Sequence, residues 1–521
     1  MNRRAFLRTS VLSLCSSMLA EADSGGAAPV FSTENRRWQD AYDRALKVLA
    51  GNVQVLPHYD HPVLIEGANY AGIWQECGPL EALVYRPFRP DVARHSHLTF
   101  FALQKEDGQL PANNKQTETG FGQIQMVAPI AATAWDLARI TDDDQLLRIA
   151  YQSCVRWDQW LLRYRNTRGT GLIEGFCTYD TGHDNSPRWT GMPNQCPNKD
   201  AKICPSAPGL PRLCPDLSAT VYGGRVALSA MAKVLGKTAD ADRWTESADQ
   251  IRRLILEKLY VPEDAAFYDL DAQGNFVRVR SDVISRVCGE HVIDHKTFDH
   301  IWQRQLHNPK AFWAPYPLPS IALDDPAYVH PAPRNSWGGP SQALTALRAP
   351  RWFEFYGKPA ELGFLMARWC EAIQRDPTFR QQIDPLTGDF NQGDLPAYSP
   401  AALAMIDFTW RLAGPREEEE TLEWNLRPKH AVAAHGARFA LSLDRGRTAA
   451  IAYHKQSAAI HLDGRPLARI DGGSARLITD KQGRPKQLLG VSEARENISI
   501  TLPSHPTQHF TLDPNQVLQL S

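Results

Sequence analysis

The sequence predicts a mainly α-helical protein: a toroid of paired helices over residues 23–420, followed by a small antiparallel β domain of the β-sandwich type over residues 421–521. Three observations predict this division. Apolar residues recur at helical spacing in long segments that come in pairs. After the acidic run 417–420, the pattern changes to short segments in which apolar and polar residues alternate. The chain of 521 residues is also far too long for one ordinary core.

The helical segments are recognisable by their amphipathic period and by the residues that end them. Gly236 and Gly357 each separate two such segments, as expected for a glycine just past a helix C-terminus. Gly414 and Pro415 end the last segment. The predicted helices span residues 125–138, 145–165, 217–235, 239–259, 341–356, 360–375 and 399–413. A long series of such pairs favours an α/α toroid over a small bundle.

The C-terminal region carries a pattern of period two. Its predicted strands span residues 437–443, 448–454, 457–462 and 497–502. Turn sequences such as Asp463-Gly464 and Asp471-Gly472-Gly473 separate them, which is typical of an antiparallel sheet. We interpret the acidic run 417–420 as a solvated linker that joins the two domains.

Charge and hydropathy exclude two classes of protein. The chain has 57 Lys and Arg residues against 58 Asp and Glu residues, and its net charge of −1 provides no basic field for phosphate backbones. We therefore expect no nucleic-acid partner. No run reaches the ~18 apolar residues that a membrane-spanning helix needs, so no membrane association is expected either.

The N-terminus resembles a twin-arginine export signal. Asn2 to Arg8 (NRRAFLR) carries the paired arginines, a short apolar stretch follows, and Ala20-Glu21-Ala22 offers small residues for cleavage. The alternative is an ordinary basic N-terminus. The signal predicts that residues 1–22 are removed and that the twin-arginine export machinery is a partner of the precursor. The mature protein is then expected in a bacterial periplasm or secreted.

Three cysteines, Cys196, Cys204 and Cys214, lie in one loop rich in proline, asparagine and lysine. An oxidising compartment would allow a disulfide there, and Cys196 and Cys204 are the nearest pair in sequence. A zinc site is the alternative, but the intervals fit no zinc pattern and the loop contains no histidine. We predict no metal site and no cofactor.

A dense polar loop covers residues 171–189 (GLIEGFCTYDTGHDNSPRW) and follows a strongly amphipathic helix, so we expect it at one end of the toroid. Asp184 in this loop has two interpretations. It either caps a turn or helix start before Ser186-Pro187, or it serves as a catalytic acid. Spacing alone favours the cap.

Six motifs in order resemble those of glycoside hydrolase family 63 and its trehalase-like relatives, over about residues 70 to 412. They are residues 107–111 (DGQLP), 169–174 (GTGLIE), 184–189 (DNSPRW), 214–219 (CPDLSA), 312–320 (FWAPYPLPS) and 384–388 (DPLTG). The resemblance implies an (α/α)6 toroid, also called a six-hairpin barrel, and an inverting glycosidase that acts on α-linked sugars. It also implies that Asp184 is the general acid.

The general base departs from the family pattern. Inverting hydrolysis needs a second carboxylate about 6.5–9.5 Å from the acid to activate water. The family has a glutamate there, and this chain has Gln381. One interpretation is that another carboxylate acts as the general base: Asp389 or Asp394, with Glu76 in reserve. A second interpretation is that Gln381 positions a water molecule that another carboxylate polarises. The remaining alternatives are an inverting phosphorylase, which needs no base, and a carbohydrate-binding barrel that cleaves nothing.

Substrate contacts are expected from aromatic and polar residues in the loops. The predicted ligand is an oligosaccharide or a small glycoside, and the predicted contacts are Trp74, Asn185, Arg188, Trp189, Asp216 and Trp337. Arg188 either grips sugar hydroxyls or a carboxylate, or forms a salt bridge with Asp180 or Asp216. Gly338 replaces an arginine that touches substrate in the family. A polysaccharide lyase that uses Tyr179 and His183 is a further alternative.

Overall fold

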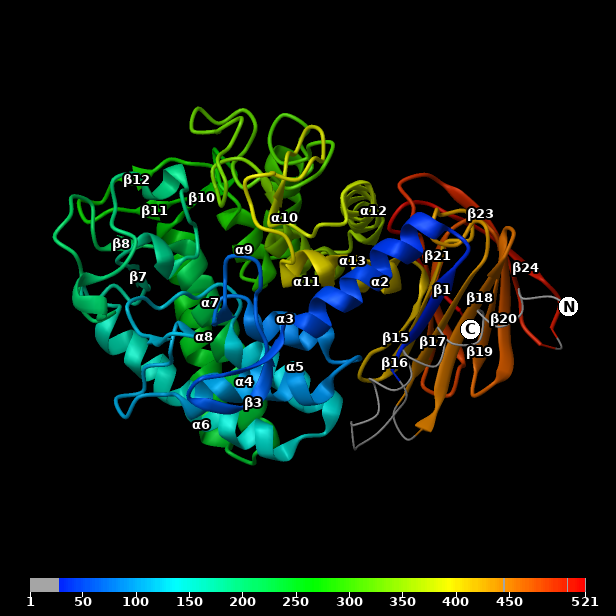
Figure 1. The fold of residues 1–521 in the computed structure, drawn as a ribbon, viewed down its shortest axis with the longest axis horizontal. Coiled ribbons are helices and arrows are strands. Elements are labelled where there is room, and N and C mark those ends of the chain that lie inside the picture. Colours follow the sequence, from blue (N-terminus) through cyan, green and yellow to red (C-terminus); the bar gives the residue numbers. More distant parts are fainter. Residues whose placement is uncertain (1–27, 444–445, 504, 521) are drawn as a thin grey trace, which may run out of the picture.

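The computed structural model of the chain describes residues 28–443, 446–503 and 505–520. The predicted export signal, residues 1–22, lies outside the described residues. A helical region occupies one side of the molecule and a stack of strands the other (Figure 1). In the described part of the chain, no helix combines the length and the apolar character that crossing a membrane requires.

The helices begin and end at the expected signals. The Asp143 side chain accepts a hydrogen bond from the Leu146 backbone nitrogen at 2.8 Å and so caps the helix that follows. Gly236 and Gly357 adopt positive φ angles of 70° and 68° between paired helices. The helices are α2 (Arg36–Gly51), α3 (Gly78–Tyr85), α4 (Pro90–Ala102), α5 (Ile130–Thr141), α6 (Asp144–Tyr164), α7 (Pro215–Val234), α8 (Thr238–Lys258), α9 (Val283–Gly289), α10 (His295–Ile301), α11 (Ala343–Phe355), α12 (Pro359–Arg375) and α13 (Ser399–Ala413).

One predicted helix starts later than its sequence suggests. Residues 125–129 are not helical, and α5 begins only at Ile130, with Pro129 as its N-cap. Gln125 has a positive φ of 45°, which a helix does not allow. The five residues run past the interior of the molecule as an irregular segment, so their apolar period reflects burial rather than helix.

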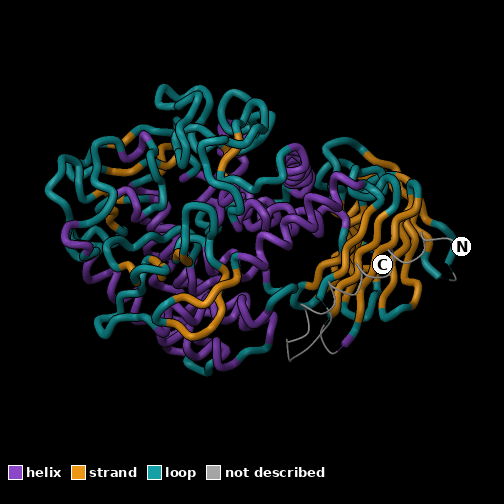
Figure 2. Tube along the Cα trace, in the orientation of Figure 1, coloured by secondary structure: helices purple, strands orange, loops and turns teal. Residues whose placement is uncertain are grey.

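The helical region also contains many short strands and long loops (Figure 2). The chain as a whole is therefore mixed helix and strand rather than mainly helical. The pairs α7 with α8 and α11 with α12 pack against each other as predicted. The closed ring of six hairpins remains a prediction.

The C-terminal region contains two antiparallel sheets. The order of the larger sheet is β1 (Val30–Thr33), β17 (Ala437–Ser442), β18 (Thr448–His454), β19 (Ser457–Leu462), β20 (Arg465–Gly472), β23 (Glu496–Thr501) and β24 (Gln508–Leu512). The order of the smaller sheet is β15 (Pro415–Glu417), β16 (Thr421–Leu426), β21 (Ala475–Asp480), β22 (Pro485–Leu489) and β25 (Val517–Gln519). Alternate residues of β18 are buried, as a period of two requires.

Two details differ from the predicted division at residue 420. The N-terminal strand β1 pairs with β17, so the larger sheet takes one strand from the start of the chain. The acidic run is no linker, because Glu417 ends β15 and the following glutamates form its turn into β16. Arg476 of β21 then forms a salt bridge with Glu354 of α11 at 2.7 Å, which ties the sheets to the helices.

Candidate active site

A cavity of about 250 Å³ lies in the helical region and contains the side chain of Asp184. Ligand sites typically begin at about 300 Å³, so this one suits a small molecule or one sugar ring. Its walls come from five stretches of the chain, namely residues 66–76, 113–125, 179–195, 335–344 and 381–398. The cavity is thus built from loops that lie far apart in the sequence.

Short strand pairs hold these loops in place. Strand β4 (Gly72–Trp74) pairs with β5 (Asn113–Lys115), and this register sets Trp74 opposite Asn113 on the cavity wall. Strand β13 (Ser341–Gln342) pairs with β14 (Gln382–Ile383), and the Ala343 nitrogen donates to the Gln381 carbonyl oxygen at 3.0 Å. These pairs fix the backbone of each wall and leave the side chains free to face the cavity.

Asp184 lies in an irregular loop between two 3₁₀ turns, Thr178–Asp180 and Pro187–Trp189. The capping interpretation is wrong, because the Ser186 side chain caps the second turn. Asn335 Nδ2 donates to Asp184 Oδ2 at 2.9 Å, and the Trp337 nitrogen donates to the Asp184 carbonyl oxygen at 3.0 Å. Burial raises the pKa of Asp184 to about 7, so this carboxyl can carry a proton near neutral pH.

The wall that contains Gln381 connects directly to Asp184. Tyr70 OH donates to Gln381 Oε1 at 3.1 Å, and Gln381 Nε2 donates to Asn335 Oδ1 at 2.9 Å. Asn335 therefore bridges the predicted acid and the residue at the family's base position. Gln381 faces the cavity as the resemblance implies, but its amide is already committed to two partners. An amide also accepts no proton from water, so Gln381 cannot act as the base.

Two further carboxyl groups face the cavity, Glu76 and Glu66. Gln125 Nε2 donates to Glu76 Oε2 at 3.3 Å. Burial raises the pKa of Glu76, and the nearby guanidinium groups of Arg348 and Arg286 oppose that shift. Burial, followed by repulsion from Glu76, raises the pKa of Glu66 well above its usual range. The pKa values of all three carboxyl groups in the cavity, those of Asp184, Glu66 and Glu76, are therefore raised above their usual ranges.

The other two predicted base candidates do not line the cavity. The side chain of Asp389 is 74% exposed and accepts a hydrogen bond from Thr387. Asp394 is buried, and its Oδ1 accepts from the Asn335 backbone nitrogen at 2.9 Å. Burial raises the pKa of Asp394 to about 6. Asp394 supports the loop that holds Asn335, and it does not face the cavity directly.

Aromatic side chains supply flat surfaces on the cavity walls. Trp74 is half-buried and meets Tyr70 edge to face, with ring centroids 5.4 Å apart. Trp337 is buried and packs edge to face against His183, with ring centroids 5.2 Å apart. Trp74 and Trp337 thus both line the cavity, and their contact with a sugar stays a prediction; stacking on a sugar ring is a recurrent use of such side chains.

The structure corrects the prediction that Arg188 and Asp216 bind substrate. Both are buried and do not line the cavity, and Arg188 forms salt bridges with Asp216 at 2.7 Å and with Asp269 at 2.5 Å. Arg188 also donates to His183 Nδ1 at 2.9 Å. All its hydrogen-bonding groups are therefore used within the protein. Asp180, the alternative partner of Arg188, instead pairs with Arg165 at 2.5 Å.

Trp189 and Asn185 do not line the cavity either. Trp189 is buried, and its indole nitrogen donates to Thr181 Oγ1 at 2.9 Å, so it fills the core. Asn185 is exposed and donates to the Asn335 carbonyl oxygen at 2.8 Å. Asn185 therefore steadies the loop of Asn335, and neither residue is placed to touch a sugar inside the cavity.

His183 is structural in this arrangement. Arg188 can only donate, so His183 Nδ1 accepts and the proton of the neutral ring lies on Nε2, which faces Asp282 Oδ1 at 2.6 Å. Burial, then repulsion from Arg286, lowers the pKa of His183 to about 4. The ring therefore stays neutral and holds the loop of Asp184 against the core. A lyase pair would need both Tyr179 and His183 to face the cavity, and His183 does not line it.

The predicted Cys196–Cys204 bridge is absent, because every cysteine in the described part of the chain is a free thiol. Cys196 Sγ lies 3.9 Å from Cys177 Sγ. Cys177, Asp180 and Cys196 bring three ligand-type atoms together, but the Arg165 guanidinium donates hydrogen bonds to both Asp180 and Cys196. A cation in that position would repel a metal ion, so this cluster does not fit a metal site.

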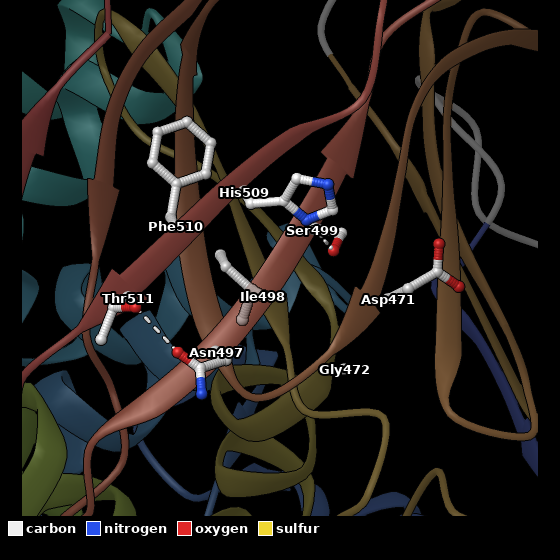
Figure 3. Close-up of a pocket in the computed structure, with 8 residues that line it drawn as sticks. All are labelled: Asp471, Gly472, Asn497, Ile498, Ser499, His509, Phe510 and Thr511. Carbon is white, nitrogen blue, oxygen red and sulfur yellow. Dashed lines mark hydrogen bonds between the residues drawn. The ribbon is translucent and has the colours of Figure 1, made fainter.

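A second hollow lies on the β region, across strands β20, β23 and β24, and Figure 3 shows the residues that line it. Its polar side chains bond to one another: Thr511 donates to Asn497 at 2.7 Å, and Ser499 contacts His509 at 2.9 Å. Asp471 is the one carboxyl among its lining residues. Acid–base hydrolysis of a glycoside needs two, so the cavity around Asp184 is the candidate active site.

Several cavity residues escaped the sequence analysis. These are chiefly Glu66, Tyr70, Asn113, Gln123, Gln125, Gln195, Asn335 and Tyr398. Most are amides or tyrosines in irregular loops, where neither a period nor a motif distinguishes them from surface residues. The positive φ of Gln125 and Asn335, 45° and 47°, marks strained positions that sequence spacing does not reveal.

Residues 70–410 match the family described as the mannosylglycerate hydrolase MGH1-like glycoside hydrolase domain. The chain belongs to this family. The match covers all the cavity-forming loops except the segment around Glu66. No curated protein matches the sequence.

Solved structures show the same fold as this MGH1-like chain at low sequence identity. A sialidase is 15% identical with a TM-score of 0.64, and the match covers 87% of this chain but only 41% of the sialidase. The GH63 mannosylglycerate hydrolase from Thermus thermophilus in complex with Tris and D-glycerate is 18% identical with a TM-score of 0.57, over 71% of this chain and 100% of that one. The neutral trehalase Nth1 from Saccharomyces cerevisiae is 13% identical with a TM-score of 0.53, over 70% and 80% of the two chains.

Proposed function

We propose that this member of the MGH1-like glycoside hydrolase family hydrolyses an α-linked sugar with inversion at the anomeric carbon, with Asp184 as the general acid. The proposal includes an (α/α)6 barrel as the scaffold and an exported mature protein. One observation carries it: Asp184 faces a sugar-sized cavity that also contains two other carboxyl groups. Family membership supports the same chemistry.

The protonation of Asp184 suits the acid step. A general acid must hold its proton until the bond to the departing oxygen breaks, and it works best when its pKa lies near the working pH. Burial brings the pKa of Asp184 to about 7, while the hydrogen bond from Asn335 fixes its Oδ2. Its other oxygen accepts no hydrogen bond from the described residues, which leaves room for the proton and the leaving group.

The charges in the cavity favour water over phosphate as the nucleophile. An inverting phosphorylase must bind an anion, and arginine or lysine side chains normally supply the counter-charge. Lys115 is the one such cation among the described residues that line the cavity, and Glu118 holds it at 2.9 Å. The three carboxyl groups supply no counter-charge for phosphate, and each one that ionises would repel it. Hydrolysis therefore fits the cavity better than phosphorolysis.

A panel of α-glucosides, α-mannosides and α-rhamnosides tests the proposal. Each is incubated with the purified protein, and proton NMR follows the anomer of the first product. We expect release of the β-anomer from at least one α-glycoside without added phosphate. Release only with phosphate, or a thermal shift on sugar binding with no product, would instead establish one of the two non-hydrolytic alternatives.

The rate should fall on the alkaline side of neutrality. Asp184 is active only when protonated, so kcat/KM should decrease as the pH rises through about 7, the pKa of this group. Above that value the decrease should approach about tenfold per pH unit, as for the loss of a single essential proton. Measurements of kcat/KM from about pH 5 to about pH 9 check it. A rate that stays constant up to the alkaline end of this range would show that Asp184 carries no essential proton.

Export depends on the paired arginines in the proposed signal. Replacing Arg3 and Arg4 together by lysine should keep the precursor in the cytoplasm of a bacterial host with a twin-arginine system. Cell fractionation and immunoblotting locate the protein, and N-terminal sequencing shows whether the first 22 residues were removed. Equal export of both versions would indicate a different route.

A further inference from the structure

We infer that Gln381 is a positioning residue for the acid: it holds the side-chain amide of Asn335 in the orientation that leaves the proton of Asp184 on Oδ1. The inference rests on the proposed hydrolysis with Asp184 as the general acid. It gives a role to the glutamine that stands where the family has a glutamate. A glutamate restored at this position is then expected to harm the reaction.

Three consecutive hydrogen bonds link Tyr70 to the acid. Tyr70 OH donates to Gln381 Oε1 at 3.1 Å, and Gln381 Nε2 donates to Asn335 Oδ1 at 2.9 Å. Asn335 Nδ2 then donates to Asp184 Oδ2 at 2.9 Å. All four residues line the cavity. Every group in this chain of hydrogen bonds therefore donates toward the acid.

The direction of the chain follows from what each group can donate or accept. An ionised Asp184 only accepts hydrogen bonds, so Asn335 must turn its amide nitrogen toward the acid. The carbonyl oxygen of Asn335 then faces Gln381, which must donate through Nε2. The Oε1 atom of Gln381 is left to accept from Tyr70. Each amide thus has one orientation whenever the acid has lost its proton.

Residue 381 must be an amide to keep this direction. Its side chain donates to Asn335 and accepts from Tyr70 at the same time. An ionised glutamate has no proton to donate, so Asn335 Oδ1 would lose its partner. Asn335 would then turn its nitrogen toward residue 381 and its oxygen toward Asp184. An acceptor that faces Asp184 Oδ2 draws the proton of the acid onto that oxygen.

The backbone of Asn335 is held on both sides. Its nitrogen donates to Asp394 Oδ1 at 2.9 Å, and its carbonyl oxygen accepts from Asn185 Nδ2 at 2.8 Å. The nitrogen of Trp337 ties the same loop to the Asp184 carbonyl oxygen at 3.0 Å. These contacts keep Asn335 beside the acid whichever way its amide points. The orientation of the amide is therefore left for Gln381 to decide.

The two oxygens of Asp184 have different roles in this arrangement. Oδ2 accepts from Asn335, while Oδ1 accepts no hydrogen bond from the described residues and carries the proton. The proton passes from Oδ1 to the departing oxygen as water adds to the anomeric carbon and the glycosidic bond breaks. The attacking water gives up a proton that reaches solvent, and Asp184 regains one from there. A proton on Oδ2 would be bonded to Asn335 and withheld from the departing oxygen.

The variant Gln381→Glu tests the inference on a glycoside that the wild-type protein cleaves. With a poor leaving group, kcat should fall at least about tenfold, a part of the about 10²–10⁴-fold that general acid catalysis contributes. The loss should be smaller for activated aryl glycosides, whose leaving groups depart without a proton. Gln273→Glu is the matched control: Gln273 is exposed on a turn and does not line the cavity, so its variant should keep wild-type activity.

Asn335→Asp breaks the same chain and keeps the question open to test if Gln381→Glu does not fold. Aspartate tolerates a positive φ, here 47°, as asparagine does, but in its ionised form it cannot donate to Asp184. Burial raises the pKa of Asp184, and the hydrogen bond from Asn335 lowers it. Loss of that bond should therefore move the alkaline decrease of kcat/KM to a higher pH, which a purely structural role of Asn335 would not do.

The possible results separate this inference from the proposed function. If Gln381→Glu matches or exceeds the wild-type kcat on a poor leaving group, a carboxylate serves better at this position and the inference alone is wrong. An equal loss on poor and activated leaving groups, or an alkaline decrease at unchanged pH in Asn335→Asp, would also overturn the inference alone. Failure of the wild-type protein to cleave any α-glycoside would overturn both.

Discussion

The variant Asp184→Asn should lose about 10²–10⁴-fold in kcat on glycosides with poor leaving groups, because an amide cannot protonate the departing oxygen. The loss should shrink for activated aryl glycosides, whose leaving groups depart without a proton. Measuring kcat across a series of leaving groups of different pKa gives the dependence directly. The loss caused by removing a general base should not depend on the leaving group, because the base does not act on it. Variants of the acid and of the base therefore differ in this dependence.

The fold should tolerate this substitution. Asparagine has the shape of aspartate, and its carbonyl oxygen can still accept the hydrogen bond that Asn335 donates at 2.9 Å. Thermal unfolding should therefore occur at the same temperature or slightly higher, since a buried ionisable group is removed. Asp389→Asn serves as the control, because this exposed aspartate lies outside the cavity and its loss should leave kcat unchanged. Wild-type activity of Asp184→Asn on a poor leaving group would refute the acid assignment.

The second large effect concerns stability: Arg188→Met should destabilise the helical region by about 3–5 kcal/mol, the usual effect of removing one partner from a buried ion pair. Arg188 makes bidentate contacts to Asp216 and Asp269, with distances from 2.5 to 2.8 Å. Among the described residues, Asp216 would keep only Arg286 as a charged partner, at 3.5 Å. Among the described residues, no other cation pairs with Asp269, so its buried charge would be left unopposed.

Thermal unfolding and urea denaturation of full-length protein measure this effect, with a helical signal followed separately from the β region because a chain of this size need not unfold in one step. Arg188→Lys should recover part of the loss, since one ammonium group can pair with only one carboxylate well. A substrate-binding arginine would behave differently, with an increased KM and unchanged unfolding. That result would restore the role predicted from sequence.

Some features followed from the sequence because they depend on local chemistry. The helices around Gly236 and Gly357 are fixed by apolar period and by glycines that adopt positive φ, and both pairs formed as predicted. Four strands of the larger sheet follow from alternation in the same way. Asp184 and Gln381 were found because they stand in an ordered set of motifs, and both line the cavity.

Other features could be decided only by tertiary structure. The role of Arg188 depends on Asp269, which is 81 residues away and belongs to no motif that the sequence analysis identified. Strand β1 joins the far end of the chain because the sheet edge formed by β17 offers unpaired backbone groups. Tyr398 donates to Glu66 and Tyr70 donates to Gln381, and these are contacts between loops that no period or spacing encodes.

The sequence by itself therefore determined the kinds of element, the order of the motifs and the candidate for the acid, because these depend on neighbouring residues along the chain. The tertiary structure decided which carboxyl groups share one cavity and which are neutralised in the core. The physical reason is that burial and charge pairing set the protonation of each group, and both depend on residues that the fold alone brings together.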